Sequence, residues 1–412
     1  MRRSVLDDWI RQKEGWAELS REKIEAMQLK KINLLLAKTK QKGKFYQYLP
    51  EKISSLEEMK KIPLLTEQQL ITNHRGMLLL SQSEVSKIIT MYSSATTGQA
   101  KRLFFSASDI EKTVDFFACG LQEIASKGDR CLVWMPANTE NSVGSLIARA
   151  LGRIKAEALI CSMDETLDAV ADFVINKKIN CAVAMPFKML SLMRYADKTG
   201  KSLPPTSVMI SADSAPPFLK QELGERYALQ VIEHYGSSES GLGGALECGA
   251  KNGMHIREND LLIEIVDDKG NWVQKGETGN IVLTTLSHEA MPLIRYQTGD
   301  NGALSAYPCR CGSVLNRLQN VYRNATANEM GELNAILFLQ KNVLDYRMLR
   351  KDNRIRIEVM LMGKVDREKI KEQLQRVVLQ KGWGARVDVH WHVEKLSLHK
   401  PYYQAKRKII AE

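Results

Sequence analysis

Apolar residues at helical spacing mark the first 60 positions of the chain. Among many lysines they recur at Leu29, Ile32, Leu35 and Leu36, which places them on one face of a helix. A loop over residues 62–66 follows. Thr66 at its end is suited to begin the next helix, because its hydroxyl can accept a hydrogen bond from a free backbone N–H group of the first turn. The pattern therefore predicts a helical N-terminal region.

Short apolar runs alternate with helical segments between residues 109 and 232. Four of these runs are typical of buried strands, at residues 131–135, 181–185, 208–211 and 229–232. Strands separated by helices in this way favour a mostly parallel sheet covered by helices. The predicted fold class is therefore α/β.

The pattern changes after Gly253. Residues 261–266 and 279–285 are strand-like, and the turn at 268–271 lies between them, which predicts an antiparallel sheet or a small barrel. Near the end, period-two alternation over 355–361 and 387–393 flanks a helical face over 370–378, which predicts a β-α-β unit. We expect a large domain of residues 1–322 and a small mobile C-terminal domain of residues 323–412.

The composition excludes two protein classes. Hydrophobic residues make up 44% and charged residues 26% of the 412 positions, so the chain is not disordered as a whole. No run of 18 uncharged apolar residues exists, which argues against a membrane-spanning helix. The N-terminus carries Asp7 and Asp8 where a secretory signal needs an apolar run, so we expect a cytoplasmic protein.

Positive charge is concentrated at the C-terminal end. The net charge is +11, and residues 321–412 hold 19 Lys and Arg against 11 Asp and Glu, which is +8. This excess favours an anionic partner or is a solvated basic face, and charge alone does not choose between them. Nucleic acid is an unfavoured partner, because no recognition motif and no basic–aromatic interleaving accompany the charge.

Three residue strings carry candidate nucleotide chemistry. The first has hydroxyls, small residues and a lysine that can surround phosphates with backbone N–H groups, but it lacks the P-loop spacing. The second offers an aromatic ring and a carboxylate, and the third an aspartate suited to ribose hydroxyls. Each alone is also compatible with an ordinary turn. They are Tyr92-Ser93-Ser94-Ala95-Thr96-Thr97-Gly98-Gln99-Ala100-Lys101, His234-Tyr235-Gly236-Ser237-Ser238-Glu239-Ser240-Gly241 and Met291-Pro292-Leu293-Ile294-Arg295-Tyr296-Gln297-Thr298-Gly299-Asp300.

In this order, the three strings resemble those of the adenylate-forming superfamily, and most closely its phenylacetate-CoA ligase-like branch. The entry segment Ile62-Pro63-Leu64-Leu65-Thr66-Glu67-Gln68-Gln69-Leu70 and the turn Cys309-Arg310-Cys311-Gly312 are similar to that branch too. The resemblance implies a large multi-layer N-terminal domain, with helix-covered sheets and a small barrel-like part, and a small α+β lid. It also implies an AMP-forming ligase that uses ATP, Mg²⁺ and coenzyme A.

The resemblance also implies a role for individual residues. The phosphates would be cradled by Ser93, Ser94, Thr96, Thr97, Gly98 and Lys101. Adenine and ribose would be held by Ala212, Asp213, Tyr235, Gly236, Ser237, Asp300 and Arg323. Glu239 would hold Mg²⁺. Lys406 would reach the reacting groups during adenylation, with Lys408 as the competing alignment.

The implied reaction has two halves. The acid attacks the α-phosphate of ATP to give an acyl-adenylate and pyrophosphate, and a thiol then displaces AMP. The thiol of coenzyme A is the expected acceptor and a carrier-protein thiol is the alternative; a homodimer is left open. A degenerate nucleotide-binding homologue is a further alternative, because Ala95 replaces a family glycine and Ala325 and Thr326 stand at the acidic positions of the family's hinge.

Four residues form a candidate metal site. Three thiols and one imidazole suit a closed, structural Zn²⁺ site with four ligands, and these are Cys248, His255, Cys309 and Cys311. The alternative is three free thiols and a surface histidine. The remaining cysteines lie in apolar runs and are predicted core residues, namely Cys119, Cys131, Cys161 and Cys181.

Overall fold

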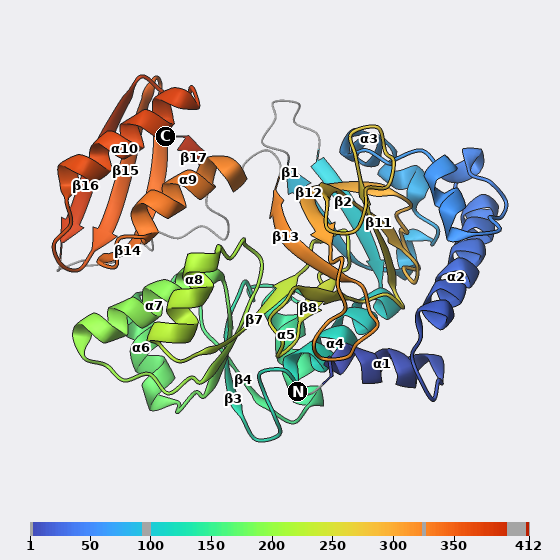
Figure 1. Ribbon diagram of the computed structural model, residues 1–412, viewed down its shortest axis with the longest axis horizontal. Helices are drawn as coiled ribbons and strands as arrows, with labels where there is room; N and C mark the ends of the chain where they lie inside the picture. Colours follow the sequence, from blue (N-terminus) through green and yellow to red (C-terminus); the bar gives the residue numbers. More distant parts are fainter. Residues whose placement is uncertain (1–2, 93–99, 324–326, 394–408, 412) are drawn as a thin grey trace. The chain divides into compact units, whose positions relative to one another are not determined.

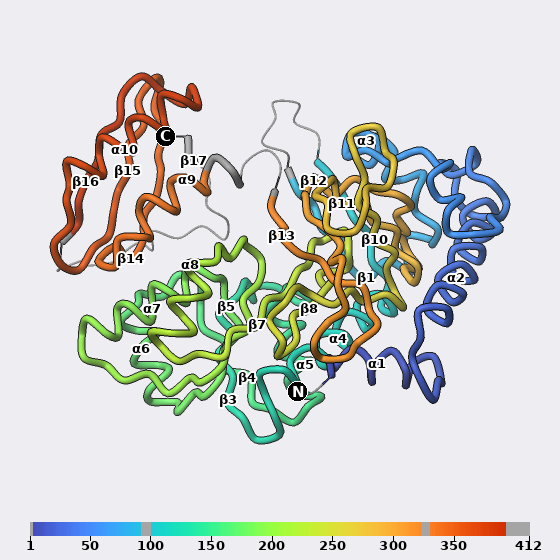
Figure 2. The backbone as a smooth tube through the Cα atoms, viewed as in Figure 1, coloured from blue at the N-terminus to red at the C-terminus, as the bar shows by residue number. Residues whose placement is uncertain are grey.

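The chain folds into two compact units, and each is built from two separate segments. The computed structural model describes residues 3–92, 100–323, 327–393 and 409–411. Unit 1 contains residues 1–123 and 232–322, and unit 2 contains residues 124–231 and 323–412. The backbone passes from unit 1 to unit 2 and back before it ends in unit 2 (Figure 2). The predicted domain division at residues 322 and 323 coincides with one of these crossings and otherwise stays a prediction.

The N-terminal helices of unit 1 form as the apolar spacing predicts. They and the adjoining short elements are α1 (Val5–Glu14), α2 (Arg21–Lys42), η1 (Phe45–Tyr48), η2 (Leu56–Lys61), α3 (Glu67–Met77), η3 (Gln82–Glu84) and α4 (Ala107–Leu121). The predicted cap of α3 is confirmed: the Thr66 hydroxyl accepts the N–H of Gln69, and the Gln69 side chain accepts the N–H of Thr66. This reciprocal pair satisfies two backbone donors that the helix leaves free.

The strand pairs within unit 1 are antiparallel. Strands β1 (Val85–Tyr92) and β2 (Ala100–Ser106) form a two-stranded sheet. A second set of neighbours follows the order β10, β11, β12, β13, β9, β8, β7. Their bounds are β7 (Gln230–Tyr235), β8 (Ala245–Glu247), β9 (Met254–Ile256), β10 (Leu261–Val266), β11 (Thr278–Thr285), β12 (Tyr296–Leu304) and β13 (Arg317–Arg323). The predicted antiparallel sheet after Gly253 is thereby confirmed.

Unit 2 begins with a parallel sheet in the order β4, β3, β5, β6. Its elements are β3 (Arg130–Trp134), α5 (Val143–Arg153), β4 (Glu157–Ile160), α6 (Leu167–Asn176), β5 (Cys181–Ala184), α7 (Pro186–Thr199), β6 (Ser207–Ile210), α8 (Pro217–Gln221) and the π-helical turn η4 (Glu222–Arg226). Three of the four predicted strands, those at 131–135, 181–185 and 208–211, are confirmed as parallel, and the sequence pattern missed β4. This strand lies at the sheet edge with both of its ends exposed, so it lacks the continuous apolar run of a central strand.

The C-terminal lobe, defined as the described residues from 327 onward, completes unit 2. It contains α9 (Ala327–Phe338), β14 (Val343–Lys351), β15 (Arg354–Leu361), α10 (Arg367–Gln380), β16 (Arg386–Val393) and β17 (Ile409–Ala411). The predicted β-α-β unit is confirmed, since β15 and β16 are parallel and α10 connects them. Both α9 and α10 lie against one face of the four-stranded sheet (Figure 1). With this lobe, the predicted fold class is also confirmed.

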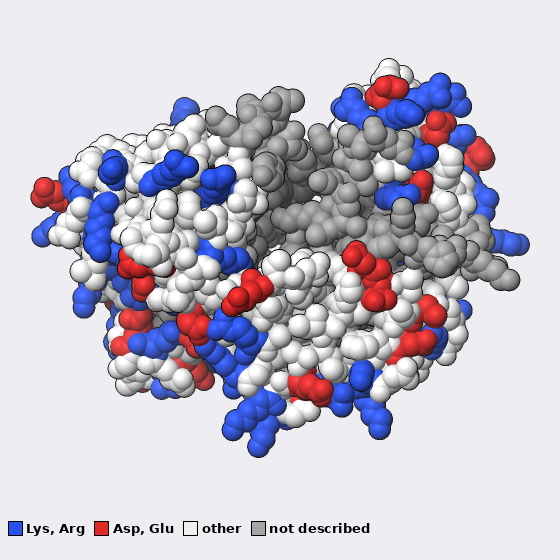
Figure 3. Space-filling model, turned by 180° about the vertical axis from the view of Figure 1, so that it is seen from behind, with Lys and Arg blue, Asp and Glu red and all other residues white. Residues whose placement is uncertain are grey.

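Basic side chains of the C-terminal lobe gather at one end of its sheet. Lys351 pairs in register with Arg354, and Arg354 pairs with Arg386. All three are exposed, and Arg386 contacts Asp388 at 3.1 Å. Basic and acidic side chains are interspersed over the face of the molecule in Figure 3.

No helix in the described part of the chain is long and apolar enough to cross a membrane.

Candidate active site

A buried lysine and a buried glutamate form the centre of the candidate site. Lys101 lies on β2, and Glu239 lies in the loop after β7. The Lys101 Nζ atom is 2.6 Å from Glu239 Oε1, 2.7 Å from Glu67 Oε1 and 3.4 Å from the Tyr296 hydroxyl. The side chains of Lys101 and Glu239 are 6% and 5% exposed, so the pair is shielded from solvent. All four residues belong to unit 1.

Burial and charge act on these two groups in opposite directions. Burial is the largest influence on Lys101 and lowers its pKa, but Glu239, Tyr296 and Glu67 together outweigh burial and the net pKa is raised. Burial likewise raises the pKa of Glu239, and the Lys101 ammonium together with hydrogen bonds to the carboxylate outweighs this effect and lowers the net pKa. Both groups are therefore charged at neutral pH. A cation and an anion held together in this way can meet a phosphate and a metal ion, respectively.

The loop that carries Glu239 has a constrained backbone. The Ser237 N–H donates to the Ser240 hydroxyl, and the Ser240 N–H donates to the Ser237 hydroxyl. A Cβ atom at Gly236 would lie 2.4 Å from the backbone oxygen of Leu242, so only glycine fits this close approach. The tight loop fixes the position of Glu239.

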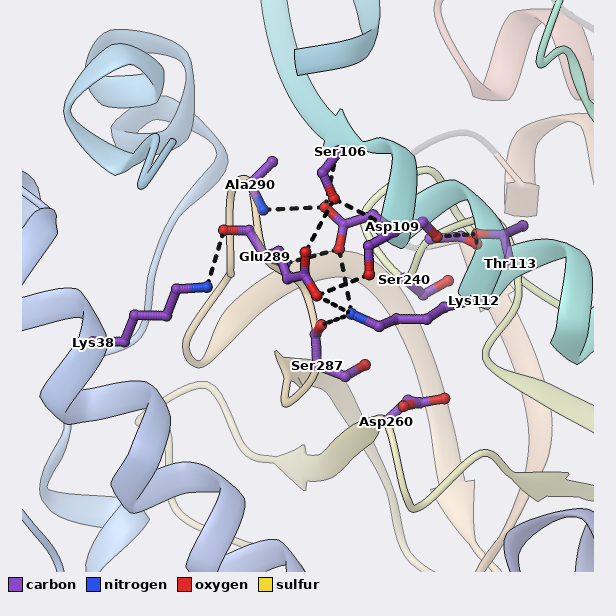
Figure 4. A network of polar contacts seen from close by, with 12 residues as sticks. Lys38, Ser106, Asp109, Lys112, Thr113, Ser240, Asp260, Ser287, Glu289 and Ala290 are labelled. Carbon is purple, nitrogen blue, oxygen red and sulfur yellow. Dashed lines mark hydrogen bonds and ion pairs between the residues drawn. The ribbon is translucent and has the colours of Figure 1, made fainter. Parts of the chain in front are cut away.

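A polar network supports the same loop from α4. Asp109 accepts hydrogen bonds from the N–H groups of Glu289 and Ala290, while Lys112 contacts the Glu289 carboxylate at 2.9 Å. One turn further along α4, the Thr113 hydroxyl donates to the carbonyl of Gly241 at 2.9 Å. Figure 4 shows these side chains converging from α4 and the segment before β12. The network ties the end of the Glu239 loop to the helix.

Two of the residues expected to hold adenosine, Tyr235 and Asp300, are hydrogen-bonded to each other. The Tyr235 hydroxyl donates to Asp300 Oδ2 at 2.9 Å, which joins the end of β7 to β12. Burial and the adjacent Asp300 carboxylate raise the pKa of Tyr235 well above its usual value, so the phenol stays protonated. The structure therefore brings Tyr235 and Asp300 together, 65 residues apart in the chain.

Two participants were missed by the sequence analysis. Glu67 is the first residue of α3 and resembles an ordinary acidic residue of a helix start. Tyr296 lies inside one of the strings, but no role was assigned to it. The residue before it, Arg295, is itself fixed, because its guanidinium contacts the buried Glu264 and donates to the carbonyl of Ile62 at 2.6 Å. The resemblance of the Arg-Tyr pair to the family string was the available signal.

The remaining predicted nucleotide residues divide into two groups. Ala212 and Asp213 lie in unit 2 after β6, where Ala212 has a φ of 70° and Asp213 Oδ1 accepts the N–H of Ser214. A second group lies outside the described residues and is not tested: Ser93, Ser94, Ala95, Thr96, Thr97, Gly98, Ala325, Thr326, Lys406 and Lys408. Arg323 ends β13, and its side chain is likewise not described.

The four predicted metal ligands come together in unit 1. The ligand atoms of Cys248, His255, Cys309 and Cys311 all lie within 4.8 Å of one another, and all four residues are buried. The Cys248 and Cys309 sulfurs are 3.8 Å apart, and Cys311 Sγ is 3.5 Å from His255 Nε2. Zinc–sulfur bonds of about 2.3 Å in a tetrahedron require ligand separations of about 3.8 Å. The donor set and its spacing therefore fit a four-coordinate zinc ion.

Burial also decides the protonation state of the histidine in this cluster. Burial and then the nearby Arg317 lower the pKa of His255 to about 4, which leaves the imidazole neutral, the form that binds metals. The other four cysteines are buried in the core as predicted, at Cys119, Cys131, Cys161 and Cys181.

Three comparisons relate the chain to known proteins. The family described as AMP-binding enzyme matches residues 47–287. Phenylacetate-coenzyme A ligase of Thermus thermophilus is 27% identical over 321 residues, which cover 73% of this chain and 70% of that protein. The ligase of the same name from Pseudomonas putida is 28% identical over 269 residues, which cover 61% of this chain and 58% of that protein.

A solved structure shares the fold. The crystal structure of 2-hydroxyisobutyryl-CoA ligase in the postadenylation state with 2-HIB-AMP aligns with a TM-score of 0.75 at 15% identity. The alignment covers 96% of this chain and 90% of that one. At this identity the likeness concerns the fold alone.

Proposed function

Because the chain belongs to the family of AMP-binding enzymes, we propose that it is an ATP-dependent acid–thiol ligase that makes an acyl- or aryl-CoA. The predicted resemblance to the phenylacetate-CoA ligase-like branch is confirmed by relatives of that name. The observation that carries the proposal is the buried Lys101–Glu239 pair in the same unit as the Tyr235–Asp300 pair. Together they supply a phosphate-binding cation, a metal-binding carboxylate and a nucleoside-binding aromatic and aspartate.

The proposed reaction proceeds in two balanced steps. A carboxylate oxygen of the acid attacks the α-phosphorus of ATP, and the bond to the bridging oxygen breaks and releases pyrophosphate. The sulfur of coenzyme A then attacks the acyl carbon, the bond to AMP breaks, and the thiol proton is lost. The protein's contribution to both steps is to orient the reactants and neutralise negative charge.

Each charged residue of the site has a task in the first step. Lys101 neutralises phosphate charge, and Glu239 holds Mg²⁺, which when bound offsets the charge of the phosphates. In the structure the two side chains neutralise each other at 2.6 Å. A phosphate bound to Lys101 would compete with Glu239 for the ammonium, which also contacts Glu67 at 2.7 Å. Asp300 accepts hydrogen bonds from ribose hydroxyls, and Tyr235 stacks on adenine.

The other residues named by the resemblance complete the proposal. Residues 93–98 contribute backbone N–H groups and hydroxyls to the phosphates, Ala212 and Asp213 line the adenine, and Arg323 contacts the nucleotide. Lys406, with Lys408 as the alternative, contacts the reacting groups during adenylation. Paired variants distinguish the two lysines: Lys406→Ala should lose pyrophosphate exchange while Lys408→Ala retains it. The opposite result would transfer the role to Lys408.

We also propose a structural zinc ion at Cys248, His255, Cys309 and Cys311. Four protein ligands close the coordination sphere, so the ion supplies stability and takes no part in the reaction. Metal analysis of protein purified without chelators should give about one equivalent of zinc. Protein that contains none and keeps its thermal stability would contradict the site.

An acid panel with and without coenzyme A tests the proposed activity. Pyrophosphate release and a CoA thioester with at least one aryl or alkyl acid are expected. Adenylation with AMP release that does not depend on coenzyme A would favour a carrier protein or another acceptor. ATP binding without pyrophosphate exchange, in folded protein, would favour a degenerate nucleotide-binding homologue. The Glu239→Gln variant should lose adenylation, and Glu57→Gln, which changes an acid 67% exposed in a surface ion pair with Lys60, serves as its control.

Location and assembly belong to the same proposal. The expected location is the cytoplasm, with the acid and coenzyme A as partners and no nucleic acid or membrane. Fractionation and light scattering test the location and the homodimer left open by the sequence.

A further inference from the structure

One face of α7 carries polar residues that are buried against the C-terminal lobe. Lys188, Ser191 and Arg194 follow one another at intervals of three, which places them along one side of the helix. They are 3%, 2% and 1% exposed. Three buried polar side chains in one row are unusual in a core, because each must find hydrogen-bond partners.

The partners of Arg194 lie on both sides of this contact. Its Nε and Nη2 atoms are 2.8 and 2.5 Å from the two carboxylate oxygens of Glu222, a two-bond geometry that suits a guanidinium. Its remaining donors reach the C-terminal lobe, at 2.7 Å from the carbonyl of Phe338, 3.2 Å from that of Gln340 and 2.8 Å from that of Val343. Arg194 thus joins η4 to the segment between α9 and β14.

One of the carbonyls that Arg194 contacts, that of Phe338, belongs to the end of a helix, and the other two lie just beyond it. Helix α9 ends at Phe338, and its last carbonyls have no partner within the helix. A cation at this end is also favoured by the helix dipole. Arg194 therefore acts as a C-terminal cap for a helix that lies more than 130 residues further along the chain.

Neighbouring residues of α7 make further contacts. The Ser191 hydroxyl donates to the carbonyl of Leu344, and the rings of Phe187 and Phe338 pack with centroids 4.6 Å apart. Lys188 donates to the carbonyl of Met163 at 2.8 Å. We use "α7 seam" for the contacts of Phe187, Ser191 and Arg194 with residues 338–344.

We infer that Arg194 is a positioning residue that fixes the C-terminal lobe to α7, so that residues 124–231 and the lobe behave as one body until the α7 seam opens. The lobe cannot leave α7 without exposing the Arg194 guanidinium to water, because three hydrogen bonds of this guanidinium end on carbonyls of the lobe. If the reaction proposed above requires the lobe to move alone between its two halves, the seam must break once per turnover. Only this kinetic consequence rests on the proposed function.

Hydrogen exchange of the full chain tests the structural part. Arg194→Met keeps the length of the side chain and removes every donor. Amides of the segment from Leu337 to Leu344 should exchange at least about tenfold faster than in the unsubstituted protein, while the β3 and β5 amides are unchanged. Arg226→Met, which removes an exposed ion pair with Asp197 in the same unit, is the matched control. Equal protection in Arg194→Met and Arg226→Met overturns the inference.

A second variant covers the case in which Arg194→Met does not fold. Arg194→Met combined with Glu222→Leu removes both charges, so no unpaired buried carboxylate remains. This variant should keep the β3 and β5 protection and lose that of the seam.

The kinetic role of the α7 seam is tested by comparing the rates of the two half-reactions in Arg194→Met. If the lobe leaves α7 between the two half-reactions, pyrophosphate exchange and thioester formation from supplied acyl-adenylate should change by factors that differ about threefold or more. Equal factors overturn the kinetic role. If the unsubstituted protein shows no pyrophosphate exchange with any acid, the proposed function fails, and hydrogen exchange still decides the structural role of Arg194.

Discussion

Substitution of Glu239 by Gln isolates the charge of the buried Lys101–Glu239 pair. The amide keeps the size and one acceptor of the carboxylate, so the main loss is the negative charge beside Lys101. Removal of one partner from a buried ion pair costs about 3–5 kcal/mol. Lys101 retains Glu67, whose side chain is 53% exposed, so we expect the free energy of unfolding to fall by about 2–4 kcal/mol. The structure thus predicts a large effect from a nearly isosteric change.

The assay is urea denaturation of the variant beside two reference proteins. Asp8→Asn removes an exposed ion pair with Arg11 in the same unit and should cost at most about 1 kcal/mol. The double variant Lys101→Met with Glu239→Leu replaces the pair by apolar side chains and should recover most of the lost stability. A loss in Glu239→Gln no larger than in Asp8→Asn would refute the argument that the pair is buried and strongly coupled.

The loss in free energy of unfolding caused by Glu239→Gln should depend on pH, and the two pKa shifts give the direction. The pKa of Glu239 is lowered on folding, so its contribution is present above its unfolded pKa of about 4.3 and is lost as the pH falls through the folded value. The pKa of Lys101 is raised, so its contribution is present below its unfolded pKa of about 10.4 and is lost as the pH rises through the folded value. The cost of Glu239→Gln should therefore be constant between about pH 6 and 9 and shrink in acid.

Three further predictions concern the metal ligands, the tight loop and a buried histidine. Cys311→Ser should lose bound zinc and lower the melting temperature, whereas Cys161→Ser should retain the metal, as read by metal analysis. Gly236→Ala should reduce ATP affinity at least about tenfold in calorimetry, because its Cβ would lie 2.4 Å from a backbone oxygen; Gly152→Ala, which meets no atom within 4 Å, should leave it unchanged. Burial and then a nearby arginine lower the pKa of His234 to about 4, so the unfolded chain binds the extra proton between about pH 6.5 and 4 and stability falls by roughly 3 kcal/mol over that range. His234→Phe should reduce this acid loss in denaturation curves, and an unchanged pH profile would contradict the assignment.

The sequence predicted the elements whose apolar pattern is continuous. Central strands such as β5 are buried at every position, so their pattern is visible without neighbours. The edge strand β4 was missed because its ends face solvent. The register and the order of the strands across the sheets could not be predicted, since they depend on contacts between distant segments.

The residues of the candidate site also differ in whether the sequence alone could predict them. Glu239 and Asp300 were predicted from family-like strings, but the hydrogen bond from Tyr235 to Asp300 joins residues that only the folded sheet brings together. Glu67 was missed because an acidic residue at a helix start has a sufficient local explanation. Arg194 was missed for a similar reason: a charged residue on a helix normally faces water, and only the fold shows that it does not.

The order in which the chain emerges during synthesis gives the divided units a further consequence. Residues 124–231 are complete well before residues 327–393 exist, and the segment between them belongs to unit 1. Until the C-terminal lobe is made, the face of α7 with Phe187, Ser191 and Arg194 has no cover. Exposed apolar surface on a nascent chain invites aggregation and chaperone binding. Protein shortened before residue 327 should therefore be poorly soluble although it contains the whole parallel sheet.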